Sequence, residues 1–375
     1  MDIEKFRKEF PHISKGKVFL NHAAIGPVSN RVVAGVNSFL KRRSEEEIDD
    51  YGLVLSDLKV SRRKIGKLIN CSENRIAFFD NSPTGLNVLS SGLVWKEGDR
   101  ILIDDTEFPS NIYPLLNLRK KGVEIDYVVA SEKYATAAEV IASIKPGTKL
   151  LYFSAVQFLS GYRIDIKKIG EYCKDNNIIF CVDGNQAVGA IKIDVEENHI
   201  DFLSCVAQKW LMGLMGLSFV YIREELQSKI NYDNYGYVVE PGISFLDFEI
   251  NSITSADSLQ TGVVNVVGVH ALNSAIDLLN EAGIEIVEEK IIQNSLYLSE
   301  KIESLGIETS INGQSNKNIA GIVSFYSPNA KAIYNALTLN KFYCSLREGL
   351  VRLSPHFYNI KDELDEAAKI IKTAI

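Results

Sequence analysis

Short apolar runs bounded by glycine or polar residues recur through the middle of the chain. Runs of this kind are typical of strands that are buried on both faces of a sheet. Segments with helical periodicity, such as 112–120 and 166–173, separate most of the runs. The predicted strands cover residues 76–79, 101–103, 125–129, 150–153, 178–182, 202–206 and 217–222.

This alternation predicts an α/β fold whose mostly parallel, seven-stranded sheet carries helices on both faces. The connection from Ala207 to Leu217 is too short for a helical crossover between two parallel strands. We therefore expect the last strand to run antiparallel to the strand before it.

The two ends of the chain have other patterns. Ser29 is a predicted N-cap, and the helix after it has an apolar face made of Val32, Val33, Val36, Phe39 and Leu40. Beyond residue 222 the alternation ends, and helical segments at 262–279 and 284–302 precede a mixture of strands and helices. We expect an N-terminal segment (1–45) near the active site, a large domain (46–255) and a smaller C-terminal α+β domain (256–375).

Composition narrows the possible partners. The 375 residues carry a formal net charge of −7, which gives no reason to expect nucleic acid or an anionic membrane. No apolar run approaches the ~20 residues of a membrane span, and the charged first ten residues do not match a signal peptide. Five scattered cysteines without metal-ligand spacing favour a reducing cytoplasm and predict neither disulfides nor a metal site.

Asp183 and Lys209 each follow the end of a predicted strand, where open α/β sheets place their ligand sites. A lysine can form a Schiff base with an aldehyde cofactor, and a carboxylate can keep a pyridine nitrogen protonated. The pair therefore favours pyridoxal phosphate (PLP). The alternative is a turn-capping Asp183 and a solvated Lys209. However, Trp210 and Leu211 follow the lysine, and burial would lower its pKa from about 10.4.

Two further stretches suit such a cofactor. Ser82 is a predicted N-cap and Pro83 a first helical residue, so the helix N-terminus would form a phosphate cup. A capped helix without a ligand is the alternative. Phe108 follows a strand end among polar residues, and its ring could stack on a planar cofactor or belong to the core.

The sequence resembles the class V aminotransferase family of fold-type-I PLP enzymes. Within that family it is similar to the branch of isopenicillin-N-epimerase-like proteins, kynureninase and SufS-type cysteine desulfurases. The resemblance runs from Phe19 to Ile370, and its most specific part is residues 182–189 followed by Lys209, 26 residues after Asp183. It implies a cytoplasmic homodimer with its active site near the subunit interface.

The resemblance also implies residue roles. Lys209 would hold the cofactor and shuttle the substrate α-proton, and Asp183 would pair with the pyridine nitrogen. The other implied cofactor contacts are Gln186 near the phenolic oxygen, Ser82, Thr84 and Gln208 at the phosphate, Phe108 on the ring, and Gln157 beside it. Gln208 replaces a histidine that many members carry before the lysine.

Arg347 and Arg352 are both candidates to bind the substrate α-carboxylate, because a guanidinium matches a carboxylate in a two-point fork. A surface or interdomain salt bridge is the alternative for both. Asn21 and His22 would lie near the substrate entrance, although a histidine in such a turn is often structural. Specificity is expected around His22 and in a loop with Tyr232, Tyr235 and Tyr237.

Three departures from the family pattern matter. Residues 348–355 contain no cysteine, although SufS-type desulfurases carry their nucleophile shortly after the carboxylate-binding arginine, and Cys344 lies on the wrong side of Arg347. Gly262-Val263 stands where the family has a Gly-Thr pair that reaches the neighbouring subunit's phosphate; Thr261 is a possible substitute. Pro83 removes one backbone donor from the phosphate cup.

These observations predict a PLP enzyme acting at the α-carbon of an amino acid, with transamination first because it needs only the groups named. Epimerisation or C–S/β-elimination would need one more acid or base, and desulfuration lacks its thiol. A non-catalytic PLP-fold binding subunit is the alternative of another class. A dinucleotide site at 213–216 is disfavoured, because no crossover helix follows that turn.

Overall fold

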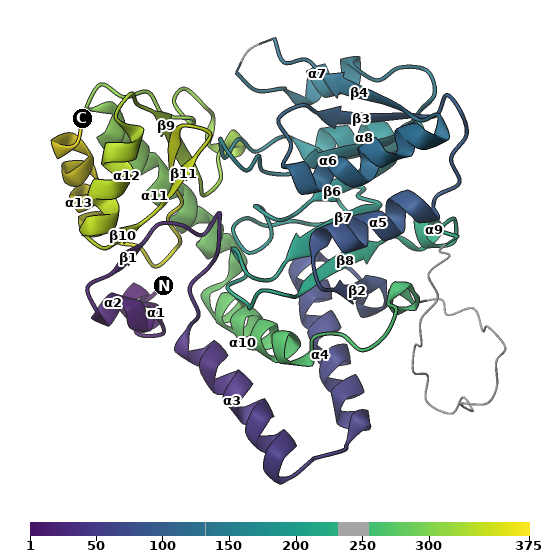
Figure 1. The fold of residues 1–375 in the computed structure, drawn as a ribbon, viewed down its shortest axis with the longest axis horizontal. Helices are drawn as coiled ribbons and strands as arrows, with labels where there is room; N and C mark the ends of the chain where they lie inside the picture. The colour runs from purple at the N-terminus through teal and green to yellow at the C-terminus, as the bar shows by residue number, and fades with distance from the viewer. Residues whose placement is uncertain (132, 232–254) are drawn as a thin grey trace.

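The computed structural model describes residues 1–131, 133–231 and 255–375, and its centre is a seven-stranded sheet (Figure 1). The strand order is β2-β8-β7-β6-β5-β3-β4. The strands are β2 (Ile76–Phe79), β3 (Arg100–Asp104), β4 (Glu124–Val128), β5 (Thr148–Ser154), β6 (Ile179–Asp183), β7 (Phe202–Val206) and β8 (Ser218–Ile222). Each of the seven predicted strands is confirmed, with bounds that differ by at most two residues.

Strand direction also follows the prediction. The pairs β3–β4, β3–β5, β5–β6 and β6–β7 are parallel. Strand β8 runs antiparallel to both of its neighbours, β7 and β2. The short connection after β7 explains this, because only a strand that returns antiparallel can follow so few residues.

Helices cover both faces of this sheet. On one face α5 (Ser82–Gly92) and α6 (Pro109–Leu116) pack over β2, β3 and β5. On the other face lie α4 (Tyr51–Ile69), α8 (Ile166–Asp175) and α10 (Val266–Ala282). Consecutive residues of β3 alternate between the two cores: Leu102 belongs to the core that also contains residues of α8, whereas Ile101 and Ile103 belong to the core of α5 and α6. Shorter elements at this domain's rim are α7 (Ala137–Ala142) and α9 (Glu224–Gln227).

The C-terminal part forms a second core around an antiparallel sheet of order β11-β12-β9. Its strands are β9 (Val323–Tyr326), β11 (Ser345–Arg347) and β12 (Leu350–Leu353), and its helices are α12 (Ala330–Leu339) and α13 (Lys361–Thr373). The N-terminal strand β1 (Val18–Phe19) pairs in parallel with β10 (Phe342–Tyr343). The beginning of the chain is therefore bound to the C-terminal part. The short helices α1 (Ile3–Arg7) and α2 (Pro11–Ser14) precede β1.

Helix α11 (Ile284–Glu303) connects the two cores. Val287 and Ile291 pack in the core of the large sheet, and Leu298 and Ile302 pack in the C-terminal core. Since α10 also belongs to the large core, the packing changes near residue 295 rather than at residue 255. The predicted domain boundaries stay a prediction, but residues 266–282 pack with the large part.

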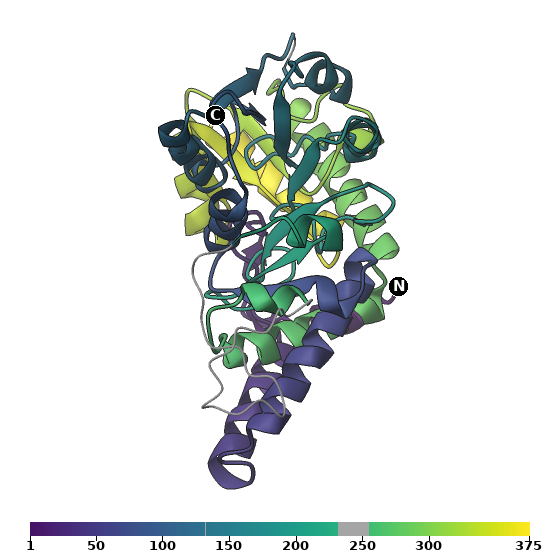
Figure 2. The ribbon, with the colours of Figure 1, turned by 90° about the vertical axis from the view of Figure 1, so that its right-hand side faces the viewer.

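Helix α3 (Asn30–Glu45) extends with α4 away from the rest of the molecule (Figures 1 and 2). Its predicted cap is confirmed: the Ser29 side chain accepts a hydrogen bond from the Val32 N–H at 3.2 Å. The predicted apolar face is only partly buried. Val32 and Phe39 pack inside, but Val33 and Leu40 are 47% and 49% exposed. Periodicity located the helix correctly but not the width of its buried stripe.

Candidate active site

Asp183 and Lys209 meet at the carboxyl ends of two neighbouring strands. Asp183 is the last residue of β6, and Lys209 stands three residues beyond the end of β7. The Asp183 side chain is buried, and Lys209 is half-buried. Burial lowers the pKa of Lys209 and raises that of Asp183. The charge of Asp183 partly offsets the shift at Lys209, and the charge of Lys209 partly offsets the shift at Asp183. The two charged groups therefore lie close enough to interact.

Asn185 fixes the Asp183 carboxylate. Its backbone N–H donates to Oδ1 at 2.6 Å, and its side-chain amide donates to Oδ2 at 2.8 Å. The side-chain Oδ1 of Asn185 accepts a hydrogen bond from the Val206 N–H at 2.8 Å, which ties this arrangement to the end of β7. Sequence reasoning missed Asn185, although an Asp-Gly-Asn sequence after a strand is a signal for such a side-chain turn.

The turn that carries Lys209 is held by the N-terminal segment. The Gly26 N–H donates to the Gln208 carbonyl at 2.6 Å. A Cβ atom on Gly26 would come within 2.4 Å of the Lys209 carbonyl oxygen, so only glycine fits this approach. The Lys209 Nζ lies 5.8 Å from the centroid of the Phe108 ring.

Phe108 is 41% exposed and packs edge-on against Phe158 at 5.2 Å. An exposed ring beside the lysine amine is not a core aromatic. It is placed so that a planar group above Asp183 and Lys209 could stack on it.

The N-terminus of α5 corrects one prediction. The N-cap is Asn81, not Ser82, and Pro83 is the second helical residue. The Asn81 side chain accepts from the Thr84 N–H at 2.9 Å and from the Thr84 hydroxyl at 3.0 Å. Ser82 is buried, and its hydroxyl accepts a long hydrogen bond of 3.3 Å from the Asn185 amide. The helix N-terminus therefore adjoins the Asp183 site, with Ser82 on its inner side.

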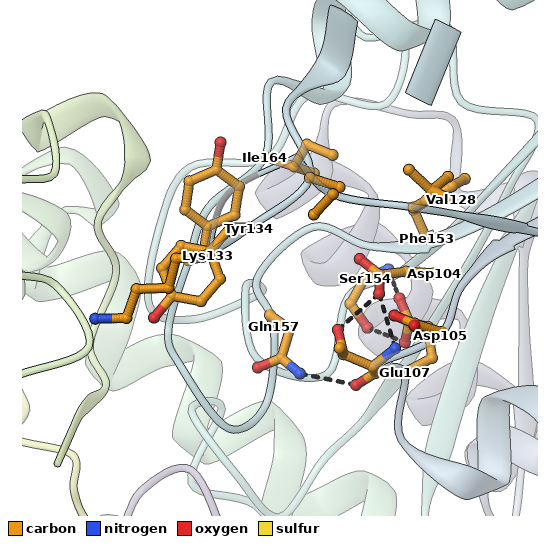
Figure 3. A pocket seen from close by; sticks show the side chains of 14 residues that line it. Asp104, Asp105, Glu107, Val128, Lys133, Tyr134, Phe153, Ser154, Gln157 and Ile164 are labelled. Carbon is orange, nitrogen blue, oxygen red and sulfur yellow. Dashed lines mark hydrogen bonds between the residues drawn. The ribbon is translucent and has the colours of Figure 1, made fainter. Parts of the chain in front are cut away.

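Three glutamines predicted at the cofactor have different surroundings. The Gln186 amide donates to the Ala23 carbonyl at 2.9 Å and accepts from the Trp210 indole at 2.8 Å. The Gln157 amide donates to the Thr106 carbonyl at 2.8 Å, a contact drawn beside Glu107 in Figure 3. Gln208 differs, because its buried Oε1 has no hydrogen-bond partner among the described residues. This unsatisfied oxygen next to Lys209 is an acceptor, so it suits a group that donates a hydrogen bond and does not support the predicted donation to a phosphate.

Arg352 is 2% exposed, and its Nη1 donates to the Phe158 carbonyl at 2.6 Å. Its buried Nε has no partner among the described residues. Arg347 is exposed. The pKa of Lys209 is lowered mainly by burial, and the charges of Arg352 and Arg347 lower it further, whereas the charge of Asp183 raises it. The positive charges of both predicted arginines therefore lie close enough to Lys209 to affect its protonation.

Asn21 and His22 have different environments. Asn21 is half-buried and accepts a hydrogen bond from the Ser345 hydroxyl in the small antiparallel sheet. His22 is fully buried, with Nδ1 3.1 Å from the Ser354 carbonyl and Nε2 2.9 Å from the Tyr358 hydroxyl. The predicted substrate contact by His22 is not supported, because both ring nitrogens already have partners. We assign it a structural role. Tyr232, Tyr235 and Tyr237 lie outside the described residues.

Glu107 is a second group that sequence reasoning missed. It is buried, and its carboxylate accepts from the Ser154 N–H at 2.5 Å and from the Asn111 amide at 3.2 Å. Burial, with a smaller effect from Asp183, raises the pKa of Glu107 to about 7. Asn111 also lowers the pKa of Asp183, so it lies between the two carboxyl groups. No short motif distinguishes Glu107, because its perturbation depends on burial.

Glu107 also borders a small cavity of about 50 Å³ (Figure 3). Asp104, Tyr134 and Gln157 line other parts of it. A volume of this size holds a few water molecules and is too small for an amino acid.

The five cysteines are free thiols. Burial raises the pKa of Cys344 to about 12, so it is not a reactive thiolate at neutral pH. Among the described residues, no group of histidine, cysteine or carboxylate side chains could hold a metal ion. No helix in the described parts of the chain is long and apolar enough to cross a membrane.

The family profile described as Aminotransferase class-V matches residues 18–365. The chain belongs to that family. A probable cysteine desulfurase of Methanothermobacter thermautotrophicus is 26% identical over 97% of this chain and 96% of its own. An uncharacterized aminotransferase of Bacillus subtilis, YcbU, is 25% identical over 97% of this chain and 96% of its own. Relatives with both activity names therefore match along nearly the whole chain.

Solved structures show the same fold-type-I architecture. The apo structure of a cysteine desulfurase from Thermococcus onnurineus NA1 superposes with a TM-score of 0.90 at 22% identity, covering 99% of this chain and 97% of its own. The cystine C-S lyase C-DES superposes with a TM-score of 0.88 at 20% identity, covering 97% of this chain and 99% of its own.

This class V family protein is a PLP-dependent enzyme that acts on amino acids. The residues present fit the cofactor. Lys209 offers an amine beside the buried carboxylate of Asp183, and Phe108 offers an exposed ring. These groups match the aldehyde, the pyridine nitrogen and the ring face of the cofactor, respectively.

Proposed function

We propose that this enzyme is an aminotransferase. The proposal rests on Lys209, whose amine lies 5.8 Å from the centroid of the Phe108 ring and interacts with the charge of Asp183, and on the buried Arg352 as a carboxylate anchor. These groups suffice for moving a proton at the α-carbon of an amino acid. Bound pyridoxal phosphate supplies an electron sink for the charge that develops there.

Each residue contributes a definable step. Arg352 binds the substrate carboxylate, which orients the α-carbon toward Lys209. The lowered pKa of Lys209 keeps more of its amine neutral, so that it takes the α-proton and returns it at another position. Asn185 holds the Asp183 carboxylate in place, and this carboxylate would hold the pyridine nitrogen of the cofactor in its protonated form.

Desulfuration is the runner-up, because several relatives are named cysteine desulfurases. That reaction needs a thiolate that can reach the substrate sulfur. Each of the cysteines 173, 181, 205 and 344 is buried with a raised pKa, and half-buried Cys71 has a pKa raised to about 12 by burial. This argues for amino transfer.

The subunits would pair near this site. Met215 and Val263 are 66% and 70% exposed, and a 3.0 Å hydrogen bond from Asn265 to Gly216 brings their two segments together. An exposed apolar surface beside the lysine turn supports a homodimer in which the segment 261–263 approaches the partner's cofactor phosphate. Light scattering of wild type and Val263→Asp tests this: a dimer that the substitution weakens supports it, and a wild-type monomer contradicts it. The free cysteines support a reducing compartment such as the cytoplasm.

Products formed by the holo-protein test the function. The purified enzyme is mixed with single amino acids without an acceptor, and cofactor absorbance and products are followed. Amino transfer predicts stoichiometric keto acid together with pyridoxamine phosphate. Alanine together with persulfide sulfur, which an added thiol then releases as sulfide, would indicate desulfuration. Racemised substrate would indicate epimerisation, and ammonia with pyruvate from cysteine or serine would indicate elimination. Binding without any product would indicate a non-catalytic subunit.

A further inference from the structure

The hairpin β11–β12 places two arginines on one face. Ser345 is opposite Arg352, and Arg347 is opposite Leu350. The turn between the strands consists of Glu348 and Gly349, both with positive φ, as in a two-residue hairpin loop. Because residues two apart share a face, Arg347 and Arg352 are diagonal neighbours, with Cα atoms roughly 7–8 Å apart in such pairs.

This face is directed at the active site. The Ser345 hydroxyl donates to Asn21, and Arg352 donates to the Phe158 carbonyl. On the adjacent strand β9, the Ser324 hydroxyl donates to the Leu159 carbonyl at 2.5 Å. The face therefore rests on the loop whose Phe158 ring contacts Phe108. The charges of both arginines also lower the pKa of Lys209, so both lie near the lysine.

Neither arginine has an acidic partner in the part of the chain that the structure describes. Within residues 1–131, 133–231 and 255–375, the ion pairs include neither Arg347 nor Arg352. Their neighbours on the face, Ser345, Leu350 and Ser324, are uncharged. Burial, followed by the charge of Arg347, lowers the pKa of Arg352 to about 10. Two unpaired guanidinium groups this close together form a site for anions.

One carboxylate does not satisfy both groups. The Nη1 of Arg352 is already bonded to Phe158, whereas its Nε is buried and unpaired. The remaining side of that guanidinium, Nε with Nη2, is a two-point fork for a single carboxylate. A substrate α-carboxylate would fill this fork. Arg347, nearer the turn and exposed, is then left for a second anionic group.

We propose that the substrates are dicarboxylic amino acids, whose α-carboxylate is bound by Arg352 and whose side-chain carboxylate is bound by Arg347. This inference rests on the proposed function, since it concerns the substrate of the same site. It goes beyond it by assigning different carboxylates to the two arginines. A neutral side chain would leave the Arg347 charge next to Arg352 without compensation.

The test compares amino acids of similar length, glutamate and aspartate against norvaline and 2-aminobutyrate. Stopped-flow changes in cofactor absorbance give a rate and an apparent affinity for each. The wild-type holoenzyme should favour the dicarboxylic member of each pair by about 100-fold in the ratio of the rate constant to the apparent dissociation constant. The reason is that the charged, two-point contact with Arg347 is lost in the neutral member.

Variants assign the two arginines. Arg347→Met should reduce the dicarboxylic preference to less than about tenfold, and Arg347→Lys should restore part of it. Arg352→Met should weaken both classes together and leave the preference in place. Lys331→Met is the matched control, since it removes one exposed positive charge from α12 elsewhere in the C-terminal core.

Two results would overturn the inference: a wild-type enzyme that treats neutral and dicarboxylic substrates alike, or an Arg347→Met variant with an unchanged preference. The spectral signal reports binding even if no amino group is transferred. A dicarboxylic preference without keto acid would therefore uphold this inference and reject the aminotransferase proposal. Keto acid formation without a preference for dicarboxylic substrates would uphold the aminotransferase proposal and reject this inference.

Discussion

Asn185 holds the carboxylate of Asp183 at both oxygens, through its backbone N–H at 2.6 Å and its side-chain amide at 2.8 Å. Removing the side-chain contact with Asn185→Ala should reduce kcat roughly 10- to 100-fold, since a hydrogen bond to a charged group is worth ~1.5–3 kcal/mol. Steady-state kinetics should show KM changing less than kcat, because Arg352 still binds the carboxylate. Asn87→Ala, on the exposed side of α5, is the control. Equal losses in both variants would assign Asn185 no special role.

Glu107 should make stability depend on pH. Burial raises its pKa to about 7, above the ordinary value of 4.5, so the folded protein holds a proton that the unfolded chain releases. The stability linked to this proton is complete below pH 4.5 and is lost as pH rises to about 7. Glu107→Gln cannot titrate, so its melting temperature relative to wild type should be higher at pH 8 than at pH 5. A difference independent of pH would contradict this.

Buried histidines should cause acid sensitivity. Burial lowers the pKa of His12 to about 4 and that of His356 to about 3, from an ordinary value of 6.5. As the pH falls, these histidines become protonated in the unfolded chain at a higher pH than in the folded protein. Their contribution to the free energy of unfolding is therefore complete above pH 6.5 and decreases as the pH falls toward about 4. Urea unfolding at pH 7.5 and 5.0 measures the loss. It should shrink in His356→Gln and persist in His199→Gln; the same loss in both would exclude His356 as a source.

Gly26 should be sensitive to one added methyl group. A Cβ there would lie 2.4 Å from the Lys209 carbonyl oxygen, so Gly26→Ala must displace the lysine turn or the N-terminal segment. We expect kcat to fall at least tenfold, because a displacement near 1 Å already misaligns reacting groups. Gly52→Ala is the control, since its Cβ meets only an Asp50 side-chain atom at 3.2 Å. Full activity of Gly26→Ala would show that the turn is set by other contacts.

The sheet was predictable because its strands are buried on both faces and are bounded by polar or glycine residues. Phe78 and Ile101, for example, are buried, so their strands contain few polar residues. Short apolar runs in the sequence are therefore enough to locate these strands. The proximity of Asp183 and Lys209 could also be inferred from the sequence, because parallel strands bring their carboxyl ends to one edge of the sheet.

Other features depend on contacts between distant parts of the chain. His22 looks like an entrance residue in sequence, but Ser354 and Tyr358, more than 330 positions later, bury and bond it. Asn81 and Ser82 are both good caps, and only the backbone geometry selects Asn81. The pKa of Glu107 is raised mainly because other parts of the chain bury it. The local sequence around Glu107 does not reveal that burial.

The most direct test of the account is to locate the cofactor on the chain. The holo-protein is reduced with borohydride, digested, and its peptides are analysed by mass spectrometry. The account predicts that the phosphopyridoxyl group is attached to Lys209 and is absent from a Lys209→Ala variant. A label on another lysine, or a wild-type protein that retains no cofactor, would contradict it.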